Sequence, residues 1–387
     1  FKQKAAYEIR NCDWSSDVCS SDLRRFGQLR RRGVDGLRFD AVHAIADDST
    51  PDIIAELAER VRQGPGANRE VHLVLENDKN ESRYLTRSEN GRPRWHTAQW
   101  NDDIHHAFHV LLTGESDGYY ADYAKQPAWY LGRCLTEGFA QQGDVSEYRE
   151  GSARGEPSAH LPPAAFVSFI QTHDQVGNRA FGERLSMLAG EAPLRAATVA
   201  WLLAPSPPML FMGEEFGAAT PFLFFCDFGP ELAAAVTAGR RREFARFARF
   251  SDPAMQAEIP DPNSNDTFAR SKLDWACLAR EPHKRWMALY RELLKLRRGR
   301  LAPRLAGMGG HFGRFEVLGE GALTVDWRLG DGSRLALCLN LSAAAAKLPA
   351  LPQGEMLHCE PPAGQKSLAS RHLPPFSAAC YLAERGI

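Results

Sequence analysis

The feature that most constrains the fold is a short apolar run that ends in charged side chains, residues 36–43, Gly-Leu-Arg-Phe-Asp-Ala-Val-His. We predict a buried strand from Val34 to Phe39 with a polar cluster at its carboxyl end. Arg38 and Asp40 are two residues apart, so on a strand both side chains point to the same face. Because a neighbouring positive charge favours the ionised form of a carboxyl group, Asp40 suits the role of a nucleophile. A purely structural ion pair between the two is the alternative.

Two later stretches repeat the pattern of an apolar run that ends in acidic side chains. Residues 71–78, Val-His-Leu-Val-Leu-Glu-Asn-Asp, contain Glu76, and residues 166–178 reach His173 and Asp174 after the run Phe-Val-Ser-Phe-Ile-Gln-Thr. In a parallel β/α barrel the active site is built where several strands end, at their carboxyl face. Glycoside hydrolysis needs a carboxylate nucleophile and a carboxylic acid on either side of one sugar bond. The pattern therefore predicts a sugar-cleaving site at one face of a barrel.

Three motifs in this order resemble the second, third and fourth motifs of the α-amylase superfamily of retaining glycosidases. They are Gly36-Leu-Arg-Phe-Asp-Ala-Val-His43, Leu75-Glu-Asn-Asp78 and Thr172-His-Asp-Gln-Val-Gly-Asn178. Any one of them alone would be a weak signal, whereas the three together are highly specific.

The resemblance implies a role for each matched polar residue. It implies Asp40 as nucleophile, Glu76 as general acid/base and Asp174 as stabiliser of the transition state. The residues that it implies as sugar contacts are Arg38, His43, His173, Gln175 and Asn178.

A cluster of acidic and histidine residues follows the next predicted strand, residues 96–100. Its place after a barrel strand suggests contacts to sugar hydroxyls from Asp102, Asp103, His105 and His106. One alternative is capping of the following helix by Asn101 and Asp102. Another is a zinc site on His105 and His109, which are four residues apart, but the Glu that a zinc-protease helix carries is missing.

The order of these elements predicts an α/β fold, a (β/α)8 TIM barrel that lacks its first three strands. Residues 24–302 are assigned to this partial barrel, with a long loop at residues 142–163 and one buried helix from Leu185 to Leu203. Five barrel strands are expected, beginning near Val34, Val71, His96, Phe166 and Pro207.

A small C-terminal all-β domain is expected after the barrel. From about residue 303 the hydrophobic period changes to two, which is typical of strands. Residues 313–318, 322–329 and 334–341 read as strands, and Gly330-Asp-Gly332 is a hairpin signal. We assign residues 303–387 to a β-sandwich domain.

Residues 1–23 do not fit this organisation. They are rich in Ser and Asp, show no helical or strand period, and resemble a translated sequencing adapter. Superfamily barrels carry three strands and a further motif before the one at Asp40. We therefore expect a fragment whose native sequence upstream of Arg24 is missing.

Composition excludes several function classes. The net charge of −1 creates no electrostatic field that would attract nucleic acid or a membrane surface. The sequence contains no run of about 18 apolar residues, which is the length that a helix needs to span a bilayer. Eight cysteines occur without a Cys-x-x-Cys pair, which favours reduced thiols in the cytoplasm. Neither a P-loop nor a complete Gly-x-Gly-x-x-Gly run is present, so no cofactor and no metal are expected.

Further stretches resemble the malto-oligosyltrehalose trehalohydrolase family within this superfamily. They are Leu73–Asp78, Gln99–Asp103 with His105-His106, His173–Leu185, Phe211–Glu215, Pro221–Phe225 and Ser271–Trp275. The resemblance implies hydrolysis of the α-1,4 bond next to the terminal trehalose unit of malto-oligosyltrehalose, releasing trehalose. A separate malto-oligosyltrehalose synthase makes that substrate and is the implied pathway partner.

The implied mechanism is double displacement, with Glu76 as acid and then base and Asp40 as nucleophile. Glu76 should then have a raised pKa and Asp40 a low one. Two alternatives stay open: another superfamily activity, such as glycogen branching or amylase, and an inactive truncated fragment that binds carbohydrate.

Overall fold

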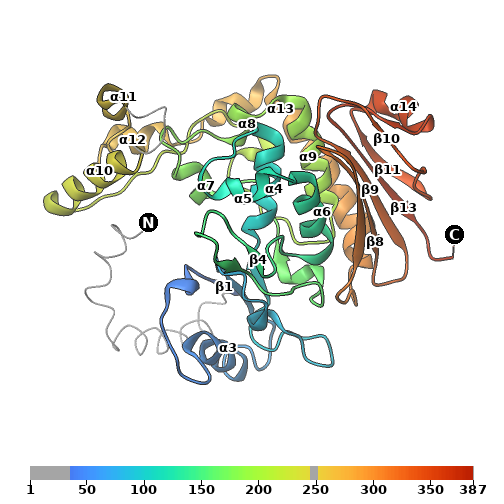
Figure 1. The fold of residues 1–387 in the computed structure, drawn as a ribbon, viewed down its shortest axis with the longest axis horizontal. Helices are drawn as coiled ribbons and strands as arrows, with labels where there is room; N and C mark the ends of the chain where they lie inside the picture. The colour runs from blue at the N-terminus through green and yellow to red at the C-terminus, as the bar shows by residue number, and fades with distance from the viewer. Residues whose placement is uncertain (1–34, 245–251, 387) are drawn as a thin grey trace. The chain divides into compact units, whose positions relative to one another are not determined.

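The structure is a computed structural model that describes residues 35–244 and 252–386 (Figure 1). The predictions for residues 1–23 and for a strand start at Val34 lie outside the described residues. Within the two described ranges, no helix is both long enough and apolar enough to cross a membrane.

The described residues divide into two compact units. The larger unit comprises residues 35–170, Ala189–Leu210 and 288–386. The smaller unit comprises Gln171–Leu188 and the described part of Phe211–Met287.

The larger unit contains the parallel sheet that the strand pattern predicted. Its strands are β1 (Gly36–Phe39), β2 (His72–Leu75), β3 (Ala98–Trp100) and β6 (Phe166–Val167), paired in that order. Gly36 pairs with His72, and a Cβ added to Gly36 would lie only 2.7 Å from the His72 carbonyl oxygen. The glycine thus permits the close approach of β1 to β2.

One amphipathic helix, α3 (Ile53–Gln63), connects β1 to β2. Its first turn is capped by Asp52, whose carboxylate accepts a hydrogen bond from the Ala55 N–H at 2.9 Å. Ile54, Ala58 and Val61 are buried on one side of the helix, which is the spacing of a core-facing stripe.

Three helices and a hairpin lie between β3 and β6. The helices are α4 (Asp102–Thr113), α5 (Ala121–Ala124) and α6 (Pro127–Glu137), and the hairpin strands are β4 (Asp144–Val145) and β5 (Ala153–Arg154). Helix α4 is buried over residues 103–110, so it belongs to the core rather than to the surface.

The fifth predicted strand, at Pro207, is reduced to a single parallel bridge between Ser168 and Pro208. Two hydrogen bonds of 2.8 Å form it, from the Ser168 N–H to the Pro207 carbonyl and from the Met209 N–H to the Ser168 carbonyl. Pro205, Pro207 and Pro208 have no N–H to donate, so a longer ladder cannot form here.

The single helix expected from Leu185 to Leu203 is two helices. They are α8 (Leu185–Leu188) in the smaller unit and α9 (Glu191–Leu203) in the larger one. Gly190, in an extended conformation, is the N-cap of α9 and separates the two. Glycine costs about 1 kcal/mol relative to alanine inside a helix, which favours the break at this point.

Among the described residues, five further helices lie wholly or partly in the smaller unit. They are α7 (His173–Gly177), α10 (Pro230–Phe244), α11 (Pro253–Ala257), α12 (Asn265–Arg270) and α13 (His283–Leu296), the last of which crosses the boundary between the units.

A five-stranded antiparallel sheet forms the C-terminal part of the larger unit. Its strands, in spatial order, are β11 (Glu355–Glu360), β13 (Ser377–Ala383), β9 (Arg334–Asn340), β8 (Ala322–Arg328) and β7 (Gly313–Gly319). A two-stranded sheet of β10 (Ala346–Lys347) and β12 (His372–Leu373) and a short helix α14 (Gln365–Ala369) accompany it. The three predicted strands and the turn between β8 and β9 are confirmed. The division into domains at residue 303 stays a prediction.

The C-terminal sheet packs on the helices of the same unit. The indole N–H of the buried Trp327, on β8, donates to the Leu135 carbonyl of α6 at 2.7 Å. A buried indole N–H needs such a partner, so this bond fixes the sheet against α6.

Candidate active site

The guanidinium of Arg38 brings the ends of three strands together. Its Nη1 donates to the Asp40 carboxylate at 2.6 Å, and its Nη2 lies 2.8 Å from Oε2 of Glu76. The same group stacks on Trp100 at the end of β3, 4.0 Å from the ring centroid. Two carboxylates from neighbouring strands are therefore held on one positive charge, whose own position is fixed by an aromatic face.

The Glu76 carboxylate is more enclosed than that of Asp40. Side-chain exposure is 18% for Glu76 and 66% for Asp40, so the two carboxylates meet solvent very differently. Oε2 of Glu76 also accepts the Ala41 N–H at 2.8 Å. Ala41 has a φ of 45°, which is uncommon for a residue other than glycine, and this turn aims its N–H at the carboxylate.

His43 lies in the turn that follows β1 and is half-buried. The backbone N–H of Asp78 donates to Nδ1 of His43 at 3.2 Å. Since Nδ1 accepts this bond, the neutral ring carries its proton on Nε2. Burial is the main reason that the pKa of His43 is lowered, so the neutral form is favoured.

Asp102 is the first residue of α4 and is half-buried. Burial, and after it the charge of Glu76, raise the pKa of Asp102 to about 8. At neutral pH this carboxyl group is mostly protonated, so it can donate a hydrogen bond to a sugar hydroxyl as well as accept one.

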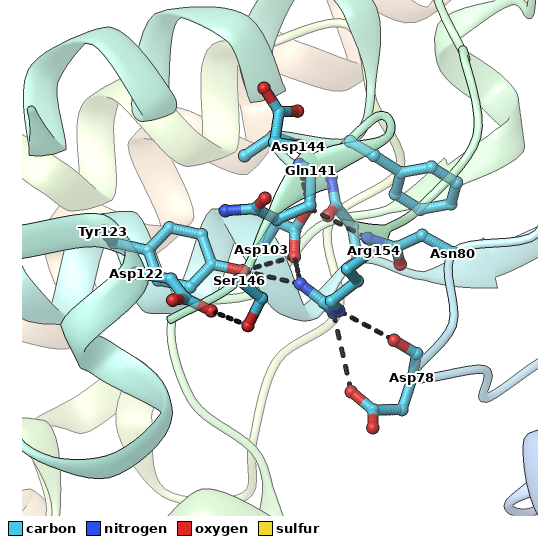
Figure 2. Close-up of polar contacts among 12 residues, drawn as sticks. Asp78, Asn80, Asp103, Asp122, Tyr123, Gln141, Asp144, Ser146 and Arg154 are labelled. Carbon is cyan, nitrogen blue, oxygen red and sulfur yellow. Dashed lines mark hydrogen bonds and ion pairs between the residues drawn. The ribbon is translucent and has the colours of Figure 1, made fainter. Parts of the chain in front are cut away.

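Asp103 is fully buried, and its carboxylate accepts five hydrogen bonds within the protein (Figure 2). Their donors are Tyr123 Oη, Arg154 Nη1, Asn80 Nδ2 and the backbone N–H groups of Ala140 and Gln141, at 2.6 to 3.0 Å. Contact of Asp103 with sugar stays a prediction, and these bonds favour a positioning task instead.

His105 and His106 are also buried. The ring nitrogens of His105 hydrogen-bond the Ile170 carbonyl at 2.7 Å and Tyr120 Oη at 3.1 Å. The His106 ring packs between Tyr119 and Tyr123, both with centroids 5.0 Å away, and burial lowers its pKa. Their predicted contact with substrate stays a prediction.

The contacts of Asn101 and His109 support neither of the two alternatives for this segment. Asn101 is the N-cap of α4, but its side chain does not cap the helix and donates instead to the Gly138 carbonyl at 2.7 Å. For the zinc alternative, His109 Nε2 lies 2.7 Å from Glu115. Among the described residues, no three His, Cys, Asp or Glu side chains are grouped so that they could hold a metal ion.

The fourth motif lies on α7, in the smaller unit. Thr172 caps this helix by accepting the Asp174 N–H at 3.2 Å, and the same hydroxyl donates to Gln175 Oε1. His173 Nε2 lies 3.6 Å from Asp174 Oδ1. His173 and Asn178 are exposed, and Asp174 and Gln175 half-buried, so all four are open to a ligand.

The segment before α7 is fixed by a buried polar pair. Gln171 Nε2 donates to Oε2 of Glu214 at 3.0 Å, and the Leu185 N–H donates to the other end of the Gln171 amide at 3.0 Å. Burial raises the pKa of Glu214 to about 8.

The sequence patterns missed several residues that shape the site. They are Trp100 under Arg38, Asp78 beside His43, and the arginines Arg149 and Arg154. Both arginines come from the long predicted loop, whose length was the only signal that it has a function.

Most of this chain matches curated proteins. The chain is 44% identical to the malto-oligosyltrehalose trehalohydrolase of Arthrobacter ramosus over 272 residues, which are 70% of this chain and 46% of that protein. It is 37% identical to that of Deinococcus radiodurans over 344 residues, 86% of this chain and 54% of that protein. The chain thus spans about half the length of the curated relatives it matches.

The fold has a match among solved structures. A candidate α-amylase of Salmonella typhimurium is 40% identical with a TM-score of 0.87, over 96% of this chain and 61% of that one. Residues 310–380 match the model of a domain of unknown function, DUF3459.

Proposed function

We propose that this chain, which belongs to the malto-oligosyltrehalose trehalohydrolase family of the α-amylase superfamily, carries the catalytic side chains of a retaining glycosidase. The enzyme hydrolyses the α-1,4-glucosidic bond next to the terminal trehalose unit of malto-oligosyltrehalose and releases trehalose. The observation that carries the proposal is the Arg38 guanidinium, which holds the carboxylates of Asp40 and Glu76 together at the ends of neighbouring strands.

The roles in the first step follow from exposure and contacts. Glu76 gives its proton to the bridging oxygen, and trehalose leaves. Asp40, the more exposed carboxylate, attacks the anomeric carbon of the glucan and forms a glycosyl-enzyme. Arg38 keeps Asp40 ionised for this attack.

In the second step Glu76, now deprotonated, takes a proton from water. The resulting hydroxide displaces Asp40 from the anomeric carbon, so the configuration is retained. Asp174, on α7, stabilises the positive charge of the oxocarbenium-like transition state. No cofactor takes part in either step.

The predicted substrate-binding residues fall into two groups according to their burial. The accessible or half-buried residues meet the sugar directly: His43, Asp102, His173, Gln175 and Asn178. The buried Asp103, His105 and His106 support the wall behind them.

The substrate is supplied by malto-oligosyltrehalose synthase, which makes that enzyme a pathway partner. We place the protein in the cytoplasm. The six cysteines within the described ranges are free thiols, which suits a reducing compartment.

Product analysis tests the function. The protein that contains this chain is incubated with malto-oligosyltrehalose and, separately, with a maltodextrin of the same number of glucose units. Trehalose from the first substrate and no product from the second is the expected result. Maltose from both would identify an amylase, and new α-1,6 bonds would identify a branching enzyme. Binding of the sugar without any product would identify an inactive carbohydrate-binding fragment.

A further inference from the structure

The hairpin at residues 141–156, called the clamp hairpin below, is firmly anchored at one side. Its strands β4 and β5 pair through Asp144 and Arg154. Arg133 of α6 donates to the Asp144 carboxylate at 2.8 Å. Figure 2 shows the second anchor, in which Asp122 of α5 accepts a hydrogen bond from the Ser146 hydroxyl at 2.5 Å. Two helices therefore hold the hairpin in place.

The opposite side of the clamp hairpin carries the buried Arg154. Its Nη1 donates to Asp103 at 2.6 Å and to Tyr123 Oη at 2.8 Å, and its Nε donates to the Asp78 carbonyl at 2.8 Å. Nη2 lies 3.6 Å from the Asp78 carboxylate. One buried guanidinium thus connects the first turn of α4 to the segment that follows Glu76 (Figure 2).

A second arginine of the clamp hairpin, Arg149, also contacts Asp78. Arg149 Nη2 donates to the Asp78 carboxylate. Burial would raise the pKa of Asp78, but the charges of Arg154 and Arg149 outweigh it and lower that pKa. Asp78 is therefore an anion held between two arginines, and its backbone N–H is the donor to Nδ1 of His43.

A third connection fixes the same segment. Asn80 is buried, and its Nδ2 donates to Asp103 at 3.0 Å. Its carbonyl accepts the Glu156 N–H at 3.2 Å, and its Oδ1 accepts from Gln99 at 3.1 Å. The residues after Glu76 are thus restrained from the clamp hairpin, from α4 and from β3.

We propose that the clamp hairpin is a positioning device for the acid-bearing segment, and that Arg149 and Arg154 are positioning residues that act through Asp78 on His43. By fixing Asp78, they fix the donor that leaves Nδ1 of His43 unprotonated and its Nε2–H free to point at a sugar hydroxyl. The inference deepens the proposed function and rests on it for its kinetic part only.

A merely structural role for these arginines is the competing account. Removing Arg154 leaves the buried Asp103 without its cation, which is strongly destabilising and can prevent folding. Arg149 is the better probe because its side chain is 30% exposed and it does not touch Asp103 among the contacts described. The charged groups that face His43 are Asp40, Asp78, Lys79 and Arg149.

The first measurement is the tautomer of the His43 ring, read from its two ¹⁵N shifts at a pH where the ring is neutral. The wild type should show the Nε2–H form. In Arg149→Met the Nδ1–H form should become populated, because the Asp78 N–H is no longer held in place. Removal of a positive charge alone would change the pKa of His43 but not its neutral tautomer.

The controls separate the clamp from general stability. Lys125→Met removes an ion pair to Glu147 on the same hairpin that does not touch Asp78, so the tautomer should stay Nε2–H. Arg149→Lys keeps the charge and should restore most of the wild-type ratio. Thermal unfolding of each variant shows that it is folded.

The second measurement is the kinetics of trehalose release by the protein that contains this chain. Displacement of catalytic groups by about 1 Å costs up to ~10²-fold in rate, so we expect kcat/KM to fall by roughly 10-fold or more in Arg149→Met. Lys125→Met should match the wild type within about twofold, because the Lys125–Glu147 ion pair is exposed and surface substitutions usually have small effects.

The outcomes distinguish the two proposals. A folded Arg149→Met with an unchanged His43 tautomer overturns the clamp, whatever the activity. A shifted tautomer together with a wild type that releases no trehalose supports the clamp and sinks the proposed function. A shifted tautomer with unchanged kcat/KM would show that the clamp has no part in the reaction, which also overturns the inference.

Discussion

Nη2 of Arg38 lies 2.8 Å from Oε2 of Glu76, and this contact joins the carboxyl ends of β1 and β2. The same guanidinium holds Asp40. Without it, two carboxylates would repel each other across a small gap, and one of them would take up a proton. The positive charge between them therefore allows the two carboxylates to lie close together at the ends of the two strands.

This contact predicts that Arg38→Ala loses activity and regains part of it with added guanidinium chloride at non-denaturing concentrations. We expect a fall in kcat/KM of about 10²-fold, the size of losing an electrostatic contact made in the transition state. Trehalose release with and without guanidinium is the measurement.

Arg83→Ala is the matched control for Arg38→Ala. Arg83 also lies over an aromatic ring, 4.2 Å from the centroid of Tyr84, and also pairs with two carboxylates, Asp52 and Glu81. It should lose little activity and gain nothing from guanidinium. Equal losses in both variants would show that Arg38 acts only through stability.

A second prediction separates the two carboxylates by chemistry. Asp40→Asn should abolish turnover but still bind the sugar, because the nucleophile is lost while the other proposed sugar-contacting residues are kept. With an activated leaving group, Glu76→Gln should regain rate in the first step, because the leaving oxygen then needs no proton from Glu76. Rates on malto-oligosyltrehalose and on an aryl glycoside are compared with a binding assay. Near-normal hydrolysis by Asp40→Asn, or equal losses of Glu76→Gln on both substrates, would contradict the assignment.

The parallel strands were predictable because each ends in a recognisable polar motif, and the C-terminal strands because their period is two. Two predictions, the fifth strand and the single helix, were wrong for reasons of local backbone structure. The fifth strand could not form a ladder through three prolines, and Gly190 divides a segment whose Ala and Leu content favours one helix. In both places one backbone property outweighs a correct hydrophobic pattern.

The site could be predicted only where chemistry and sequence spacing coincide. Arg38 and Asp40 share a strand face, so their pairing follows from the sequence. The pairing of Arg154 with Asp103 does not follow from the sequence, because it depends on how the clamp hairpin folds against α4, which lies much earlier in the chain. The sequence alone likewise could not show that Asp102 is half-buried while its neighbour Asp103 is fully buried, because both depend on the placement of α4.

A third prediction concerns Asp102, whose pKa is raised to about 8 from an ordinary value of 3.8. Between these two pH values the unfolded chain has released this proton and the folded one has not, so stability falls as pH rises through this window. Asp102→Asn stays neutral at every pH and should remove that slope. Urea unfolding at pH 5 and pH 9 measures it.

The expected result is that Asp102→Asn gains stability relative to the wild type between pH 5 and pH 9. Glu214→Gln is a matched variant in the smaller unit, since burial also raises the pKa of Glu214 to about 8. It should show the same sign. A wild type whose stability is equal at both pH values, with no change in Asp102→Asn, would contradict the raised pKa.

The last prediction concerns an ion network between the C-terminal sheet and two helices of the same unit. Arg195 of α9 holds Glu360 with two bonds, of 2.8 and 3.0 Å, and His358 Nδ1 lies 2.9 Å from Glu292 of α13. His358 Nε2 lies 3.9 Å from Glu360. Burial alone would raise the pKa of Glu360, but His358 and Arg195 outweigh it and lower that pKa to about 2.

The sign of the pH dependence follows from the two shifts. The stabilisation by Glu360 is complete above its ordinary pKa of 4.5 and is lost as pH falls toward about 2. Burial would lower the pKa of His358, but Glu360 and Glu292 outweigh it and raise that pKa. The stabilisation by His358 is therefore complete below pH 6.5 and is lost as pH rises through the pKa of the folded state.

Glu360→Gln leaves Arg195 without its anion and should cost on the order of 3 kcal/mol at pH 7. It should also flatten the loss of stability between pH 4.5 and pH 2, and His358→Gln should flatten the loss above pH 6.5. Urea unfolding of each variant across pH 2.5–9 measures both slopes.

Arg300 provides the control, because it pairs with the exposed Glu355 on β11, the strand that also carries Glu360. Arg300→Gln should cost less than about 1 kcal/mol and change neither slope. If the acid slope survives in Glu360→Gln, some other carboxylate carries it and the network is not the link between the sheet and α9.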